Sequence, residues 1–355
     1  MTTRATHTLT DFWRHFIREM PKVELHLHLE GAFTFPTLLS LIRKYGDQGQ
    51  VRTLEELRQK FVYRDFLHFI ETWVWKNQYF RAAEDFELAV YETLMDLRKQ
   101  NLLYVEAFFS PWDFKTNGLG MEEITEAVLA GCTRASRDCG IRWRLIADIN
   151  REHGPDAGLR RIEQVRKYKD RGVIGIGLGG REREFPAAAF AEVYAEAAHQ
   201  GLFCTAHAGE ADGARSVRAA LEQLHVHRVG HGVRAVEDPH VVSLLKRLHV
   251  PLEICVTSNV MTGVVPSPAQ HPLRKLFDAG LTLTINTDDP TMFGCTLSGE
   301  FQLLLGVLGF SPGEIRSLCL NAVNASTLAE EEKAVLKRTV EQAWASVPLD
   351  AWLEP

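Results

Sequence analysis

The sequence predicts an α/β protein built as a closed (β/α)8 barrel. Two observations support this fold class. Eight short, apolar, β-rich runs alternate with helical patterns along the chain, and polar residues suited to chemistry follow several of these runs at the end where such a barrel carries its active site. A doubly wound open sheet would give a similar alternation and is the alternative fold.

The eight expected strands are spread over most of the chain. They cover residues 23–29, 102–109, 143–149, 173–178, 203–207, 229–233, 252–256 and 281–287. Helix signals lie between them: Asp238-Pro239 is typical of an N-cap followed by the first helical residue, and Ser311-Pro312 predicts another helix after the last strand. One TIM barrel domain over residues 1–355 accounts for this order.

One interval is too long for a single crossover helix. About 70 residues separate the first two strands, so we expect a helical insertion over residues 32–100 that emerges at the C-terminal face of the barrel. Within it, the segment DFLHFIETWVWKNQYF is rich in aromatic residues. Its rings are interpreted first as the insertion's own core, with a substrate lid or apolar pocket wall as the alternative.

Composition excludes several classes of protein. The chain has 355 residues, 45% of them hydrophobic, so wholesale disorder is excluded. A net charge of -6 without a basic cluster argues against a nucleic-acid partner. No apolar stretch approaches a membrane span and no signal-peptide pattern is present, so we expect no membrane partner and a cytoplasmic location. Six cysteines without a CxxC pair predict neither a disulfide framework nor a thiolate zinc site.

Potential metal ligands fall at the ends of three expected strands. His26 and His28 are two residues apart on the first strand and therefore share a face. His207 ends the fifth strand, and Asp288 follows polar residues of the same parity on the eighth, which predicts that it points toward the barrel axis. The HxH pair alone is more typical of satisfied polar residues. Three imidazoles and a carboxylate together favour zinc, with iron, cobalt or manganese as alternatives.

Two further residues fit hydrolytic chemistry beside such a metal. Glu210 lies outside the ligand set, and a closed pocket would raise its pKa so that it stays protonated and can donate a proton. His231 is flanked by glycines; as a lone residue it would more often be structural, but near a metal it could accept a proton from water or orient the attacking hydroxide. A metal there would lower the pKa of a water ligand toward neutrality.

Six motifs occur in order, each at a strand end: PKVELHLHLEGA, GLGGRE, TAHAGE, GHGVRA, TSNVMTG and NTDDP. From about Pro21 to the last helices the chain resembles the adenosine deaminase family of the amidohydrolase superfamily. The resemblance implies a barrel with one Zn2+ per chain, held by His26, His28, His207 and Asp288. No lysine ends the fourth strand, so a second metal is not expected, and the PCxxC signature of cytidine-type deaminases is absent.

The resemblance also implies roles around a 6-aminopurine. Glu210 would donate a proton to N1, His231 would handle the attacking water, and Asp289 would bind N7. The backbone N–H of Gly180 would meet N3. The remaining substrate contacts come from the first strand and its end, namely His28 and Glu30.

Two departures from the family pattern bear on the substrate. Where adenosine deaminases tend to read HLDG, this chain has Leu29-Glu30-Gly31, and GLGGRE replaces DLAGDE. We expect an adenosine or 2′-deoxyadenosine deaminase, with water as co-substrate. GLGG favours 6-aminodeoxyfutalosine deaminase as an alternative and HLHLEG favours adenine deaminase, whereas TSNVMTG argues for the nucleoside. Outside this class, the alternatives are a non-purine mononuclear amidohydrolase and a non-enzymatic ligand-binding barrel.

Overall fold

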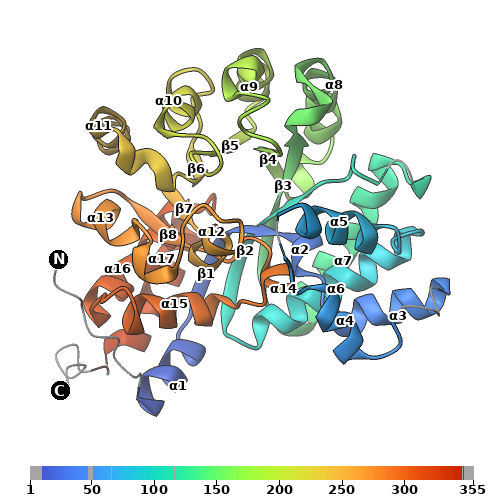
Figure 1. Cartoon of the computed structure of the whole chain (residues 1–355), viewed down its shortest axis with the longest axis horizontal. Helices are drawn as coiled ribbons and strands as arrows, with labels where there is room; N and C mark the ends of the chain where they lie inside the picture. The colour runs from blue at the N-terminus through green and yellow to red at the C-terminus, as the bar shows by residue number, and fades with distance from the viewer. Residues whose placement is uncertain (1–9, 47–50, 65, 115–116, 346, 348–355) are drawn as a thin grey trace.

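Eight parallel strands form a nearly closed barrel (Figure 1). The computed structural model describes residues 10–46, 51–64, 66–114, 117–345 and 347. Each strand pairs with the next in sequence, and the end of the series returns to β1 through a parallel bridge between Leu27 and Asp288. There the N–H of Asp288 donates to the His26 carbonyl at 3.0 Å, and the N–H of His28 donates to the Asp288 carbonyl at 2.8 Å. The TIM barrel prediction is confirmed, and the open sheet is excluded.

The strands are short, as expected for a barrel with a packed interior. They are β1 (Lys22–His28), β2 (Leu102–Phe109), β3 (Arg142–Asn150), β4 (Val173–Gly179), β5 (Phe203–Ala208), β6 (Arg228–His231), β7 (Leu252–Ile254) and β8 (Leu283–Ile285).

Helices surround the barrel (Figure 1). Those before β3 are α1 (Asp11–Glu19), α2 (Leu29–Ala32), α3 (Phe35–Tyr45), α4 (Leu54–Lys60), α5 (Phe66–Asn77), α6 (Ala83–Arg98) and α7 (Met121–Cys139). Those between β3 and β8 are α8 (Pro155–Arg166), α9 (Ala191–His199), α10 (Ala214–Glu222), α11 (Pro239–Leu248), α12 (Val256–Met261) and α13 (Leu273–Asp278). After β8 come α14 (Pro290–Phe293), α15 (Leu297–Gly306), α16 (Pro312–Ala325) and α17 (Glu330–Ala345). None of the helices in the described ranges is long and apolar enough to cross a membrane.

The predicted helix signals are present in the structure. Asp238 caps α11 by accepting the N–H of His240 at 2.8 Å, with Pro239 as the first helical residue. Ser311 caps α16 and forms a capping box with Glu314.

The last two strands are shorter than predicted. β7 ends at Ile254 because Val256 already begins α12. β8 ends at Ile285, and the N–H of Thr287 donates to the Glu24 carboxylate at 2.7 Å rather than to a neighbouring strand. Asp288 therefore does not continue the alternation of β8. It points inward from a left-handed backbone, with φ of 68°, beyond the end of the strand.

The long segment between β1 and β2 contains the helices α2 to α6, and its position over the C-terminal face of the barrel stays a prediction. α6 packs against α7 and belongs to the outer ring. Before it, the Phe69 ring of α5 stacks on Phe293 of α14, with ring centroids 5.2 Å apart, whereas Phe80 is fully buried against Phe33. Phe80 therefore fits the first interpretation, in which the rings form the insertion's own core, and the alternative of a substrate lid or pocket wall stays a prediction. Its residue 65 lies outside the described part of the chain.

Candidate active site

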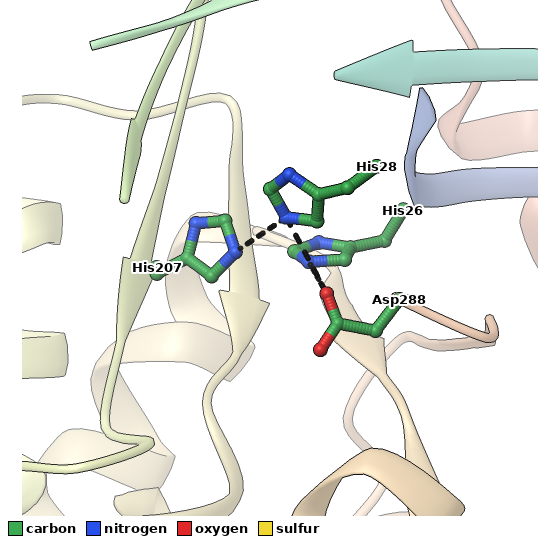
Figure 2. A group of neighbouring side chains, drawn as sticks. All are labelled: His26, His28, His207 and Asp288. Carbon is green, nitrogen blue, oxygen red and sulfur yellow. Dashed lines mark hydrogen bonds and ion pairs between the residues drawn. The ribbon is translucent and has the colours of Figure 1, made fainter. Parts of the chain in front are cut away.

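The four predicted metal ligands meet at the C-terminal end of the barrel (Figure 2). His26 and His28 come from β1, His207 from β5, and Asp288 from the turn after β8. The Nε2 atoms of His28 and His207 are 3.1 Å apart, and Asp288 Oδ1 lies 3.3 Å from His26 Nε2 and 3.4 Å from His28 Nε2. One ligand atom from each residue falls within 4.8 Å of the others. This is a buried His-His-His-Asp metal site.

The donor set fits a divalent metal ion. Burial lowers the pKa of His28 to about 4 and that of His207 well below its usual value, so both rings are neutral and each keeps a nitrogen lone pair. His26 Nε2 is buried without a hydrogen-bond partner among the described residues. Burial lowers the pKa of His26, but the nearby carboxylates of Asp288 and Glu253 outweigh it and raise this pKa to about 10. The site therefore favours positive charge, which a metal ion would supply.

Three residues behind the ligands orient them. Glu253 of β7 accepts the His26 Nδ1 proton at 2.7 Å, which leaves Nε2 facing the site. Arg228 Nε donates to the other Glu253 oxygen at 2.5 Å. Ser258 Oγ donates to Asp288 Oδ2 at 2.6 Å, so that Oδ1 faces the imidazoles. Such contacts behind a metal ligand fix its tautomer and its direction. The sequence analysis assigned no role to these residues.

Two residues of the candidate site have strained backbones. His231 has φ of 57° and Asp288 has φ of 68°, a left-handed conformation that costs a residue with a Cβ about 1–2 kcal/mol. The backbone bridge to β1 holds Asp288 in this conformation. Strain of this kind is typical of residues whose direction matters more than their contribution to stability.

The loop after β5 positions Glu210, and a second glutamate that the sequence analysis left without a role holds this loop. The Glu182 carboxylate accepts the backbone N–H groups of Gly209 at 2.6 Å, Glu210 at 3.2 Å and Asp212 at 2.9 Å. Burial is the main cause that raises the pKa of Glu210 to about 8, and the charges of Asp288 and Glu182 add to it. The Glu210 carboxyl is therefore protonated at neutral pH, which a proton donor requires.

His231 lies next to Glu210 and the metal site. Its Nε2 is 3.6 Å from Glu210 Oε2 and 3.9 Å from Asp288 Oδ2, and its side chain is fully buried. Burial lowers the pKa of His231 to about 3, so the ring is neutral. Nδ1 on the far side contacts the Asn259 amide nitrogen at 3.1 Å.

Asp289 is buried beside the first strand's end. Burial and the neighbouring Asp288 charge raise its pKa well above the usual value, and Oδ1 has no hydrogen-bond partner among the described residues. A Cβ on Gly31 would lie 1.8 Å from that oxygen, so the close approach of α2 requires glycine here. A protonated Asp289 can donate to an acceptor such as a ring nitrogen.

Glu30 and a buried lysine lie at the same end of the site. Glu30 Oε1 accepts the Ser110 N–H at 2.8 Å, while Oε2 is buried without a partner in the described structure. Burial raises the pKa of Glu30, and the charge of Lys76 on α5 opposes this shift. Lys76 itself is buried over the Trp73 ring, 3.9 Å from its centroid. No sequence pattern pointed to Lys76, because a lysine on an insertion helix is normally solvated.

Gly180, whose backbone N–H is predicted to contact the substrate, directly follows β4. Gly180 is exposed there with φ of 96°, a conformation that favours glycine, and its N–H contact with a purine stays a prediction.

Asp148 at the end of β3 was not predicted as a site residue. Its Oδ1 is buried and unpaired within the described residues, and burial raises its pKa to about 8.

Fold and site define a metal-dependent aminohydrolase of the barrel type. The chain belongs to the adenosine deaminase family, since the model of that family, described as "Adenosine deaminase", matches residues 21–343. As a member, it carries out metal-dependent deamination of an aminopurine. The prediction of a deaminase is confirmed, and the non-enzymatic alternative is excluded.

Relatives with three different names are similar over almost the whole chain. An adenine deaminase from Rhizobium leguminosarum is 38% identical over 90% of this chain and 98% of the relative. An aminodeoxyfutalosine deaminase from Acidothermus cellulolyticus is 33% identical over 93% and 96%. An adenosine deaminase from Klebsiella pneumoniae is 33% identical over 90% and 98%.

Two solved structures share the fold. The adenine deaminase from Arthrobacter aurescens has a TM-score of 0.87 and 31% identity, over 92% of this chain and all of that chain. An amidohydrolase from Burkholderia ambifaria, solved with bound Zn, has a TM-score of 0.86 and 27% identity, over 97% of this chain and 98% of that chain.

Proposed function

We propose that the protein is an adenine deaminase, which converts adenine and water to hypoxanthine and ammonia. This reverses the order expected from the sequence, where adenosine-type nucleosides came first. Relatives named adenine deaminase support the change, at up to 38% identity. The structural observation that carries it is Glu30, whose Oε2 is buried without a partner.

Free adenine differs from its nucleosides at one ring nitrogen. In adenine, N9 carries a proton and needs a hydrogen-bond acceptor, whereas in a nucleoside N9 is bonded to the sugar. A buried, unpaired carboxylate oxygen is costly unless a ligand satisfies it. Glu30 has one more methylene than the aspartate of the HLDG pattern, so its oxygen reaches further into the site. We assign Glu30 Oε2 as the acceptor for N9–H.

The other site residues have the roles that their protonation suits. One Zn2+ per chain, held by His26, His28, His207 and Asp288, would supply an activated water at neutral pH. Glu210 donates a proton to N1, which makes C6 more electrophilic. Asp289, protonated, donates to N7.

Two contacts complete the proposed site. His231 contacts the attacking oxygen, and the Gly180 N–H donates to N3. The new C–O bond at C6 and loss of the amino group as ammonia then give the 6-oxo product.

A nucleoside is the second candidate. The adenosine deaminase from Klebsiella and the aminodeoxyfutalosine deaminase from Acidothermus cover the chain as completely as the adenine deaminases. Asp148 is a further buried acceptor without a partner, and a sugar hydroxyl could satisfy it.

A substrate panel tests the proposal. We expect ammonia release from adenine with the largest kcat/KM among adenine, adenosine, 2′-deoxyadenosine, AMP and 6-aminodeoxyfutalosine. AMP should be poor because a phosphate would meet the buried acceptor Glu30. A nucleoside with the largest value would overturn the assignment of adenine, and no ammonia from any of them would favour a non-purine amidohydrolase.

A variant pair tests the role of Glu30 itself. Glu30→Asp should lower kcat/KM for adenine by at least about 10-fold, since the shortened side chain loses the N9 hydrogen bond. The effect on adenosine should be smaller. The matched control Glu222→Asp, at an exposed position at the end of α10, should change neither value. An equal loss for both substrates would contradict the N9 contact.

A further inference from the structure

A chain of buried hydrogen bonds leads from the backbone to His231. The N–H of Leu273 contacts His271 Nδ1 at 3.0 Å, and His271 Nε2 contacts Asn259 Oδ1 at 3.1 Å. The Asn259 amide nitrogen contacts His231 Nδ1 at 3.1 Å. His271 is 4% exposed, and Asn259 and His231 are fully buried, so solvent cannot replace any of these contacts.

The direction of every hydrogen bond in this chain follows from the backbone N–H of Leu273, which is the donor at its start. A backbone N–H can only donate, so His271 Nδ1 is an acceptor and the proton of the neutral ring is on Nε2. Burial lowers the pKa of His271 to about 4, which keeps this ring neutral. His271 Nε2–H therefore donates to Asn259 Oδ1. The Asn259 NH2 group then faces His231 Nδ1, which can only accept.

We propose that His271 and Asn259 are positioning residues that fix His231 as the Nε2–H tautomer. His231 then donates a hydrogen bond to the attacking oxygen and does not act as the base that removes its proton. This inference rests on the proposed deamination. It chooses between the two roles that the sequence left open for His231.

The surroundings of His231 Nε2 fit a donor directed into the site. The nearest carboxylate oxygens are 3.6 Å and 3.9 Å away, on Glu210 and Asp288, and Nε2 has no hydrogen-bond partner in the described structure. The left-handed backbone of His231 holds the ring in this direction.

Proton balance gives the consequence for Glu210. The two protons of water end on N1 of hypoxanthine and on the departing ammonia. If His231 cannot accept a proton, Glu210 is the carrier: it gives its proton to N1, and it then transfers the proton of the new C6 hydroxyl to the leaving amino group. The remaining water proton restores the Glu210 carboxyl.

The direct test is the tautomer of His231 in the zinc-loaded protein. In protein with 15N-labelled histidine, the couplings between ring nitrogens and carbon-bound ring protons distinguish the two tautomers and the imidazolium. The signals lost in His231→Asn assign this ring. We expect an unprotonated Nδ1 and a protonated Nε2. A protonated Nδ1 would overturn the proposal, whatever the substrate proves to be.

The Asn259→Asp variant should reverse the tautomer. A carboxylate accepts from both histidines, so the proton of His231 should move to Nδ1. We then expect kcat to fall about 10²-fold, as when one donor to a developing oxyanion is lost, with zinc content and KM little changed. A reversed tautomer with wild-type kcat would overturn the role assigned to His231.

A second pair of variants tests the more distant residue. His271→Leu removes the donor to Asn259, so the amide can turn over and both tautomers of His231 should appear, with a fall in kcat. His271→Gln keeps an N–H near the position of Nε2 and should restore both the single tautomer and most of kcat. Equal losses in the two variants, without a change of tautomer, would reduce His271 to a structural role.

Discussion

At the scale of single residues, Glu210 combines burial, neighbouring negative charge and a position next to His231. Burial and the charges of Asp288 and Glu182 raise its pKa to about 8, so the carboxyl can deliver a proton at neutral pH. The same surroundings would make a permanently charged group there unfavourable. The proposed function of Glu210 therefore depends on its proton rather than on its charge.

We predict that Glu210→Gln keeps its metal and loses about 10²- to 10⁴-fold in kcat, because an amide cannot replace the acid. Steady-state kinetics and elemental analysis of the same sample measure both effects. Glu222→Gln, at an exposed glutamate of α10 paired with Arg218, is the control and should behave as wild type. Near-normal turnover of Glu210→Gln would remove this residue from the mechanism.

At the scale of secondary-structure elements, α2 must approach the turn after β8 closely. This approach depends on Gly31, because a Cβ there would overlap Asp289. Neither element alone requires the glycine. The requirement arises only when barrel closure brings the ends of β1 and β8 together.

We predict that Gly31→Ala displaces Asp289 and lowers kcat/KM, with a loss of stability of about 1–3 kcal/mol, as is usual for overpacking. Thermal unfolding and kinetics would measure the two effects. Gly313→Ala on α16 is the matched control, because nothing lies within 4 Å of the added methyl group. If the two variants are equally active and stable, the close packing of α2 on Asp289 is wrong.

The link from α13 to His231 also has a consequence for stability. Burial lowers the pKa of His271 from 6.5 to about 4, so between these pH values the unfolded chain binds more protons at this residue than the native protein. Stability should therefore fall as the pH drops from about 6.5 to 4, by up to about 3 kcal/mol from this group. Denaturant unfolding at several pH values should show a shallower fall in His271→Gln. An identical slope in both proteins would contradict a buried neutral His271.

The elements that the sequence predicted best are those with strong local signals. Alternating apolar runs located all eight strands, and the Asp238-Pro239 pair located a helix start. The ends of β7 and β8 were predicted too far along because side-chain contacts, such as that of Glu24 with Thr287, take over from strand pairing. Such contacts join residues far apart in sequence and leave no local pattern.

The metal ligands could be found because each lies near or just beyond the C-terminal end of a strand, so barrel topology alone brings them together. Glu253 and Asn259 could not be assigned in the same way, because their roles depend on which atom of His26 or His231 they contact. An acidic residue inside the short apolar strand β7 was the available signal for Glu253. Lys76 was missed because its burial depends on the path of the insertion.

At the scale of the whole molecule, the barrel brings together residues from opposite ends of the chain. The metal ligands span residues 26 to 288, and the N-terminal insertion meets α14 through Phe69 and Phe293. Metal binding should therefore stabilise the barrel where β1 and β8 meet. Ligands that bind only the native state raise stability in this way.

We predict that one metal ion in the His-His-His-Asp site is required for deamination of an aminopurine. A zinc titration of chelator-stripped protein tests this requirement, with ammonia release from adenine and bound zinc measured in each sample. We predict that activity is absent without metal, rises in proportion to bound zinc and saturates at one ion per chain, and that His207→Ala neither binds zinc tightly nor gains activity. Turnover by the metal-free protein, or a requirement for two ions per chain, would contradict the claim.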